Sequence, residues 1–164
     1  MTRGWTCRLI ASGSKAADGR IAAYVEPVLL SAGEAECAVL RNNNLARYAG
    51  QNSGLIAMIG QGAGRYPTAS AVLRDLTGIA QGESAMFPPD VANGAADNSS
   101  ESHVYYVRLP KAAAVKLPIR QVFSDEGGVL RVLTEELSVL SMHETAAALR
   151  KAGSAVFFAA VREA

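Results

Sequence analysis

The residues best suited to chemistry in this sequence form a glycine-rich loop between an apolar run and a helix-like pattern. Residues 55–59 are apolar, and Gly60, Gly62 and Gly64 follow at alternate positions before the helical pattern begins. Glycine lets the backbone approach a ligand closely, and the first turn of a helix leaves N–H groups without intrahelical partners. A strand, a glycine loop and a helix in this order can aim backbone amides at a polar or charged ligand.

The glycine spacing by itself leaves two interpretations open. It reads G-x-G-x-G, with Arg65 where the dinucleotide fingerprint G-x-G-x-x-G has its third glycine, and the phosphate-loop pattern G-x-x-x-x-G-K-[ST] is absent. A tight turn that leads into a packed helix accounts for the glycines as well as a ligand site does. Thr68, which follows Pro67, is predicted to cap a helix over 68–80 or to lie in its first turn.

A longer string around this loop resembles a known enzyme family. Residues 60–76, GQGAGRYPTASAVLRDL, are similar to the glycine loop and last catalytic-domain helix of homoserine dehydrogenases, which commonly read G-x-G-A-G-x-x-P-T-A-S-A-V. RLIASGSKAADGRIAAYVEPVLL (8–30) resembles the family's preceding strand pair, and NNNLARYAGQNSG (42–54) resembles its strand and turn before the loop.

The resemblance implies the family reaction, in which NAD(P)H reduces L-aspartate 4-semialdehyde to L-homoserine on the pathway to threonine and methionine. By resemblance, the loop approaches the nicotinamide end of the cofactor, NADP or NAD, and offers it backbone amides. The implied cofactor-binding residues are Gly62, Ala63, Gly64 and Thr68.

The resemblance also implies that no catalytic residue lies in this chain. The family's dinucleotide fold, catalytic lysine and substrate-binding acids precede the matched segment, so we expect the chain to be inactive alone. The lysines present do not match the catalytic position: Lys15, Lys111, Lys116 and Lys151. The alternative is a non-catalytic regulatory or interaction protein.

The elements that must position the loop predict an α+β chain. Strands are expected over 5–12, 20–30, 44–49 and 55–59, with a short helical turn within 31–41. We assign 1–81 to the C-terminal part of a homoserine dehydrogenase-like catalytic and dimerisation domain with a mixed sheet. Residues 82–103 are rich in Gly, Pro, Asn and Ser and are predicted to be a mobile linker.

Residues 104–164 are predicted to form a ferredoxin-like β-α-β-β-α-β module. Strands are expected over 104–109, 129–135, 137–142 and 155–161, and helices over 144–152 and across 115–123, where Val115, Ile119, Val122 and Phe123 share a helical face. The module resembles the ACT domain, a regulatory unit at the C-terminus of many homoserine dehydrogenases. Its acidic-x-Pro-Gly effector turn is replaced by residues 110–114, PKAAA, so amino-acid effectors should bind weakly or not at all.

Composition narrows the class of protein. The chain has 164 residues, 49% hydrophobic and 19% charged, with a net charge of +1, which predicts a globular protein without nucleic-acid or membrane partners. Cys7 and Cys37 are predicted to be reduced thiols in a cytoplasmic protein. His103 and His143 lack ligand spacing, so no metal site is predicted.

The helical face of 68–80 predicts association. Its apolar side chains would pack on the dinucleotide domain in the family, and no other cover is evident from sequence. We therefore expect a homo-oligomer, a dimer at least, or a separate N-terminal dinucleotide-binding chain as partner. The face comprises Val72, Leu73, Leu76 and Ile79.

Overall fold

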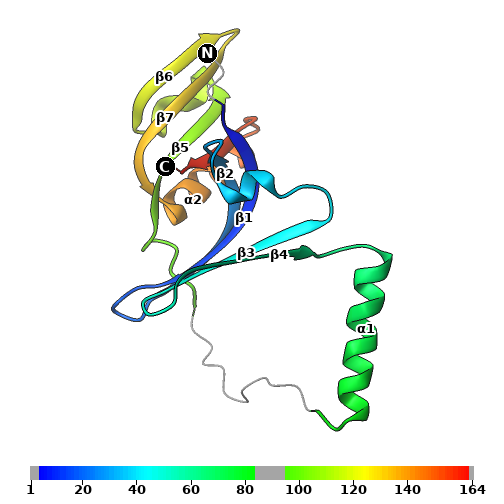
Figure 1. Ribbon diagram of the computed structural model, residues 1–164. Helices are drawn as coiled ribbons and strands as arrows, with labels where there is room; N and C mark the ends of the chain where they lie inside the picture. The colour runs from blue at the N-terminus through cyan, green and yellow to red at the C-terminus, as the bar shows by residue number, and fades with distance from the viewer. Residues whose placement is uncertain (1–3, 84–94, 163–164) are drawn as a thin grey trace. The chain divides into compact units, whose positions relative to one another are not determined.

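The computed structural model describes residues 4–83 and 95–162 (Figure 1). The chain divides into two compact units, one formed by 1–32 with 93–164 and the other by 33–92. In the described residues there are eight β-strands, two α-helices and two short 3₁₀ helices. The predicted α+β class with a mixed sheet is confirmed, and the two units are described here one at a time.

The first unit is built on a six-stranded sheet of order β1-β2-β8-β5-β7-β6 (Figure 1). β1 and β2 form a long antiparallel hairpin, and β2 then pairs in parallel with β8 through Val28↔Ala160 and Leu29↔Val161. All other neighbours in this sheet are antiparallel. The strands are β1 Thr6–Lys15, β2 Ile21–Leu30, β5 Ser102–Pro110, β6 Ile119–Glu126, β7 Val129–Ser138 and β8 Phe157–Val161.

The core of this unit lies between the sheet and α2 (Val139–Lys151). Ser138 starts the helix, because its hydroxyl accepts a hydrogen bond from the Ser141 backbone N–H at 3.1 Å. Residues at helical spacing then face the sheet, and they pack over alternate residues of the strands. The buried apolar side chains include Val139, Met142 and Ala146 of α2, Tyr105, Val107 and Leu109 of β5, and Phe158 and Ala160 of β8.

The opposite face of the sheet carries a second apolar cluster. Leu29, Leu133, Ala159 and Val161 are buried there beneath partly buried aromatic side chains that include Tyr106. Tyr105 is fully buried, whereas Tyr106 contacts the rings of Phe123 and Phe157. The two adjacent tyrosines therefore point to opposite faces of the sheet, as successive residues of a strand do.

The second unit contains the antiparallel hairpin of β3 (Asn43–Gly50) and β4 (Gly54–Gln61), followed by α1 (Arg65–Ala80). A 3₁₀ turn, η1 (Ala35–Ala38), precedes the hairpin, as the sequence predicts. Arg47 of β3 donates to Glu36 of η1 at 2.6 Å and so ties the two elements together. No residue of α1 is buried.

One predicted helix is wrong. Residues 111–116 form a 3₁₀ turn, η2 (Lys111–Lys116), and the chain is extended again by Ile119 to make β6. Pro118 interrupts the helical pattern, and Gly127 and Gly128, with φ of 60° and 76°, turn β6 back onto β7. The apolar residues at helical spacing therefore pair with a neighbouring strand instead.

The predicted division into two strands, 129–135 and 137–142, is also wrong. β7 continues to Ser138, partly because the Glu135 N–H donates to Pro118 O at 2.8 Å, and α2 then begins five residues before the predicted helix. The observed order from residue 102 is strand, 3₁₀ turn, two strands, helix and strand, which is not the predicted β-α-β-β-α-β. The ACT-like character of this segment stays a prediction.

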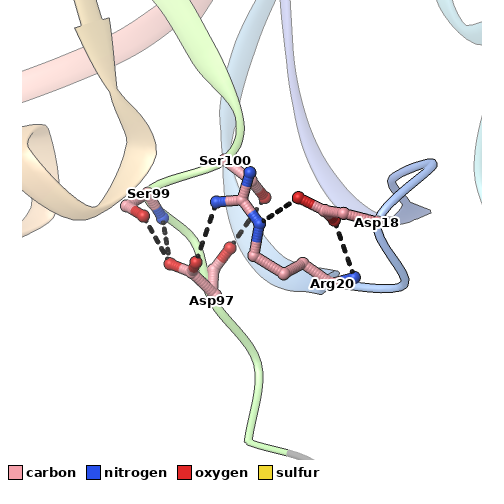
Figure 2. Close-up of polar contacts among 5 residues, drawn as sticks. All are labelled: Asp18, Arg20, Asp97, Ser99 and Ser100. Carbon is pink, nitrogen blue, oxygen red and sulfur yellow. Dashed lines mark hydrogen bonds and ion pairs between the residues drawn. The ribbon is translucent and has the colours of Figure 1, made fainter.

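The predicted linker is only partly described, since residues 84–94 lie outside the described ranges. Its later part is bound at the start of β2, where the Asp97 N–H donates to Ile21 O at 2.8 Å. The Arg20 guanidinium also donates to Asp97, at 3.2 Å (Figure 2). Ala23 N–H also donates to Asn98 Oδ1 at 2.9 Å. The division into 1–81, 82–103 and 104–164 stays a prediction. The two compact units, 1–32 with 93–164 and 33–92, have different boundaries.

Candidate functional site

The glycine loop joins β4 to α1 and is fastened by one asparagine. The Gly62 N–H donates to Asn42 O at 2.8 Å, and the Asn42 side-chain amide donates to Ala63 O at 2.7 Å. Asn42 thus holds the loop through both its backbone and its side chain. The residues of the loop are exposed, so its remaining polar groups face solvent.

The local structure explains why glycine occupies two of the three loop positions. Gly64 is the N-cap of α1, with φ of 122° and ψ of 158°, a conformation that side chains with a Cβ rarely adopt. At Gly62 an added Cβ would collide with the side-chain amide of Asn44. Gly60 has open space around it, so its identity is not explained by packing.

The helix begins earlier than predicted, at Arg65, and the possibility that Thr68 is its cap is wrong because Gly64 holds that position. Thr68 lies in the first turn, and its N–H donates to Gly64 O at 3.1 Å. Pro67 has no N–H, so Arg65 and Tyr66 supply the first-turn amides without an intrahelical acceptor. The Arg65 guanidinium lies 5.2 Å from the Tyr66 ring centre and adds positive charge beside these amides.

A second polar cluster lies in the first unit, around the buried carboxylate of Glu26. Glu26 is 1% exposed, and its Oε2 lies 3.0 Å from His143 Nε2 of α2 and 3.3 Å from the Tyr105 hydroxyl of β5. His103 Nε2 is 3.9 Å from the other carboxylate oxygen and 2.9 Å from the Tyr24 hydroxyl. The cluster therefore links β2, β5 and α2 through polar contacts inside an apolar core.

The tyrosines of this cluster act as neutral donors. Burial raises the pKa of Tyr105, and the negative charge of Glu26 beside it raises that pKa further. Burial likewise raises the pKa of Tyr24. Both hydroxyls therefore keep their protons at neutral pH, and the Tyr105 hydroxyl stabilises the carboxylate by donating to it.

Sequence reasoning missed this cluster. The helix predicted over 144–152 left His143 outside it, but His143 lies inside α2 because that helix begins at Val139. One signal was available in the sequence: Glu26 shares its face of the strand with the apolar residues Ala22, Val28 and Leu30, so an acid stood at an inward position. In the described ranges, no group of three or more His, Cys, Asp or Glu side chains is arranged to hold a metal ion.

The lysines lie apart from the glycine loop in the chain. Lys15 ends β1, Lys151 ends α2, and Lys111 forms an ion pair with Asp125; all three side chains are exposed. The second unit, residues 33–92, contains no lysine. Neither described α-helix has the length and apolar character needed to cross a membrane.

Comparison with known proteins gives a consistent result. The family model described as homoserine dehydrogenase matches residues 1–77. An NAD(+)-dependent homoserine dehydrogenase of Pseudomonas canavaninivorans is 36% identical over 74 residues, which are 45% of this chain and 21% of that protein. The chain therefore spans about a fifth of the length of this curated relative.

Solved structures resemble the fold over nearly the whole chain. A homoserine dehydrogenase from Thiobacillus denitrificans has a TM-score of 0.67 at 20% identity, covering 98% of this chain and 43% of its own. Homoserine dehydrogenase from S. aureus at pH 7.0 has a TM-score of 0.58 at 22% identity, with the same coverage. At these identities the likeness concerns the fold.

Proposed function

We propose, from the premise that this chain is homoserine dehydrogenase-like, that it forms part of an enzyme that reduces L-aspartate 4-semialdehyde to L-homoserine. The observation that carries the proposal is the geometry of residues 60–68. The string that resembles the family folds as a strand, a fastened glycine loop and a helix N-terminus. The product would serve threonine and methionine synthesis.

The loop fits one end of a nicotinamide cofactor, NAD or NADP. Gly62 and Gly64 stand where a side chain would clash or be strained, and the amides of Arg65 and Tyr66 lack intrahelical acceptors. The cofactor, when bound, supplies the hydride. Gly62, Ala63 and Gly64 would position it through the backbone, with Thr68 in the adjoining first turn.

The chain is proposed to be inactive alone, in a cytoplasmic setting. Reduction of an aldehyde needs a proton donor close to the hydride source, and the unit that carries the glycine loop has no lysine. The missing functions would come from the dinucleotide-binding part of a homoserine dehydrogenase, whether on another chain or elsewhere in the protein.

An assay of NADH and NADPH oxidation with aspartate 4-semialdehyde tests this proposal. We expect no turnover by residues 1–164 alone, and turnover when the dinucleotide-binding part of the Pseudomonas relative is added as a separate polypeptide. In that mixture Gly64→Val should abolish activity, because valine is strained at a φ of 122°. Gly33→Ala is the matched control, since its Cβ meets open space. Activity of the chain alone, or equal activity of both variants, would contradict the proposal.

A non-catalytic regulatory role is the second candidate, and one observation favours it. Among the strands from residue 102 onward, the sheet order is β8-β5-β7-β6, with every neighbouring pair antiparallel. Numbered within that segment, this order is 4-1-3-2, the order of a ferredoxin-like sheet such as the ACT domain. If the mixture described above stays inactive while the chain alters a homoserine dehydrogenase added intact, the regulatory role is favoured.

A further inference from the structure

We propose that the side-chain amide of Asn44 is a further ligand-binding group beside the glycine loop, and that it pairs with the carboxamide of a nicotinamide ring. This inference rests on the proposed function, because it concerns the cofactor that the loop is proposed to bind. Asn44 adds a side chain to a site that otherwise acts through its backbone, and it selects the nicotinamide end of the cofactor over the adenine end.

Asn44 lies on the face of the β3–β4 hairpin to which the loop glycines belong. It is the cross-strand partner of Gly60, and one pair further along the Gly62 N–H donates to Asn42 O. Residues two apart on a strand share a face, so two asparagines lie opposite two glycines at this end of the hairpin. An added Cβ at Gly62 would overlap the Asn44 amide, whereas one at Gly60 would meet open space. The Asn44 side chain therefore extends toward Gly62, into the space that this glycine leaves.

The two asparagines differ in what their side chains bind. The Asn42 amide donates to Ala63 O at 2.7 Å, so it is used in holding the loop. Among residues 4–83 and 95–162, the Asn44 side chain has no hydrogen-bond partner, and the residue is exposed. Water satisfies an exposed amide in the free protein. The donor and acceptor groups of Asn44 are therefore available to a ligand that approaches the loop.

The chemistry of asparagine favours a carboxamide as that ligand. Its side chain offers N–H donors and a carbonyl acceptor next to each other, and a primary carboxamide presents the same two groups. The two amides can therefore form a pair of hydrogen bonds. The backbone amides of Arg65 and Tyr66 can only donate, so they suit a carbonyl or phosphate oxygen but not an NH₂ group. Asn44 supplies the acceptor that the NH₂ of a carboxamide needs.

NMR spectra of the full chain test this pairing without any enzymatic activity. We expect nicotinamide mononucleotide at millimolar concentration to shift the Asn44 side-chain NH₂ signals. Adenosine monophosphate, which has a ribose and a phosphate but no carboxamide, should leave them in place. Asn44→Ala should weaken the binding of nicotinamide mononucleotide, followed at the Gly62 N–H, by about tenfold, the loss of two neutral hydrogen bonds. Asn43→Ala is the matched control, because successive residues of β3 point to opposite faces.

A cofactor analogue tests the same contact in the mixture described under the proposed function. In the reduced 3-acetylpyridine analogue of NADH, a methyl group replaces the NH₂ of the carboxamide. Asn44→Ala should raise the KM of NADH by about tenfold with little change in kcat. It should raise the KM of the analogue by less, because the analogue has only one of the two hydrogen bonds to lose. A residue that only shaped the loop would change both KM values equally.

The two measurements distinguish failure of the pairing from failure of the proposed function. An inactive mixture, with the Asn44 signals still shifted by nicotinamide mononucleotide, would count against the enzymatic role alone. An active mixture in which Asn44→Ala affects NADH and its analogue equally would overturn the pairing alone. The pairing is also overturned by the absence of any shift, by equal shifts with adenosine monophosphate, or by equal weakening in Asn43→Ala. Circular dichroism checks folding; should Asn44→Ala unfold, the two titrations of the wild-type chain decide the result.

Discussion

Glu26 shows at the scale of single residues how this fold tolerates a charge in its core. A buried carboxylate is costly unless donors surround it, and this one is reached by His143 from α2 and Tyr105 from β5. Each contact joins a different element to β2. The cluster is therefore a structural link between the N-terminal hairpin and the strands from residue 102 onward.

Removal of His143 should destabilise the first unit. His143→Leu leaves the buried carboxylate with a weaker set of donors, and we expect the free energy of unfolding to fall by about 1–3 kcal/mol. Urea unfolding followed by circular dichroism measures the change. Glu26→Gln is the partner variant: in the double mutant the two losses should not add, because the residues are in contact. Full additivity would show that the contact contributes nothing.

Acid should weaken the contact shown in Figure 2. Hydrogen bonds from Arg20, its backbone N–H first, lower the pKa of Asp18, and the Ser99 hydroxyl is the main group that lowers the pKa of Asp97. A carboxyl whose pKa is lower in the folded state than its ordinary value of 3.8 stabilises the fold at pH values above 3.8. That contribution is lost as the pH falls through the lower, folded-state pKa.

We therefore expect the urea midpoint of the wild-type chain to drop as the pH is taken below about 4. In Asp97→Asn the drop should be shallower, because one of the two titrating groups is gone. Ser53→Ala, in the exposed turn between β3 and β4, is the control and should follow the wild-type curve. The carboxyls are exposed, so the difference will be small; identical curves for wild type and Asp97→Asn would contradict the assignment.

At the scale of elements, α2 depends on a cap and β6 on a turn. The Ser138 hydroxyl accepts from the Ser141 N–H and marks where β7 ends and the helix begins. The Gly127-Gly128 turn folds β6 onto β7. The cap and the turn each involve only a few residues. They nevertheless determine the structure where the longer hydrophobic patterns, across 115–123 and over 137–142, predicted a helix and a strand.

Loss of the cap should cost a measurable part of the stability. Ser138→Ala removes the acceptor of the Ser141 N–H, and we expect a loss of about 1 kcal/mol in the free energy of unfolding. Ser138→Asp should keep most of the stability, since aspartate caps a helix equally well. Thermal unfolding of the two variants and the wild type gives the comparison; equal stability of the alanine and aspartate variants would mean that the cap has no energetic role.

At the scale of the whole molecule, the second unit leaves large apolar side chains exposed. On α1, Val72, Leu73, Leu76 and Ile79 are 52–69% exposed. Leu55, Met58 and Ile59 of β4 are about as exposed, each by 60% or more. Such patches usually mark interfaces. We propose that the chain associates as a dimer or larger homo-oligomer, or with a dinucleotide-binding partner.

Analytical ultracentrifugation at micromolar concentration should show self-association of the isolated chain. Leu73→Glu with Leu76→Glu should shift it toward monomer, because burying a leucine in an interface contributes roughly 1.5–3 kcal/mol and a glutamate cannot replace it. Arg74→Glu, on the same helix but not among the apolar residues of that face, should leave the association unchanged. A wild-type chain that sediments as a monomer would rule out the homo-oligomer and leave the dinucleotide-binding partner as the only cover proposed for this face.

The sequence by itself determined the features that depend on neighbours along the chain. Strand-like runs separated by turn residues predicted the β1–β2 and β3–β4 pairs, and the string from Gly60 to Leu76 predicted the glycine loop and the helix and carried the resemblance to homoserine dehydrogenases. These follow from backbone preferences of Gly and Pro and from the two-residue period of strands, which act locally.

Tertiary structure decided what depends on partners far away in the chain. Ile119, Val122 and Phe123 have helical spacing, yet they lie in a strand because β7 offers backbone partners to β6. Nothing near Glu26 in sequence reveals that His143 and Tyr105 reach it. The pairing of β2 with β8 likewise joins residues about 130 apart. Hydrogen bonding and burial between such distant segments outweigh local preference, since they account for most of what stabilises a strand or a buried charge.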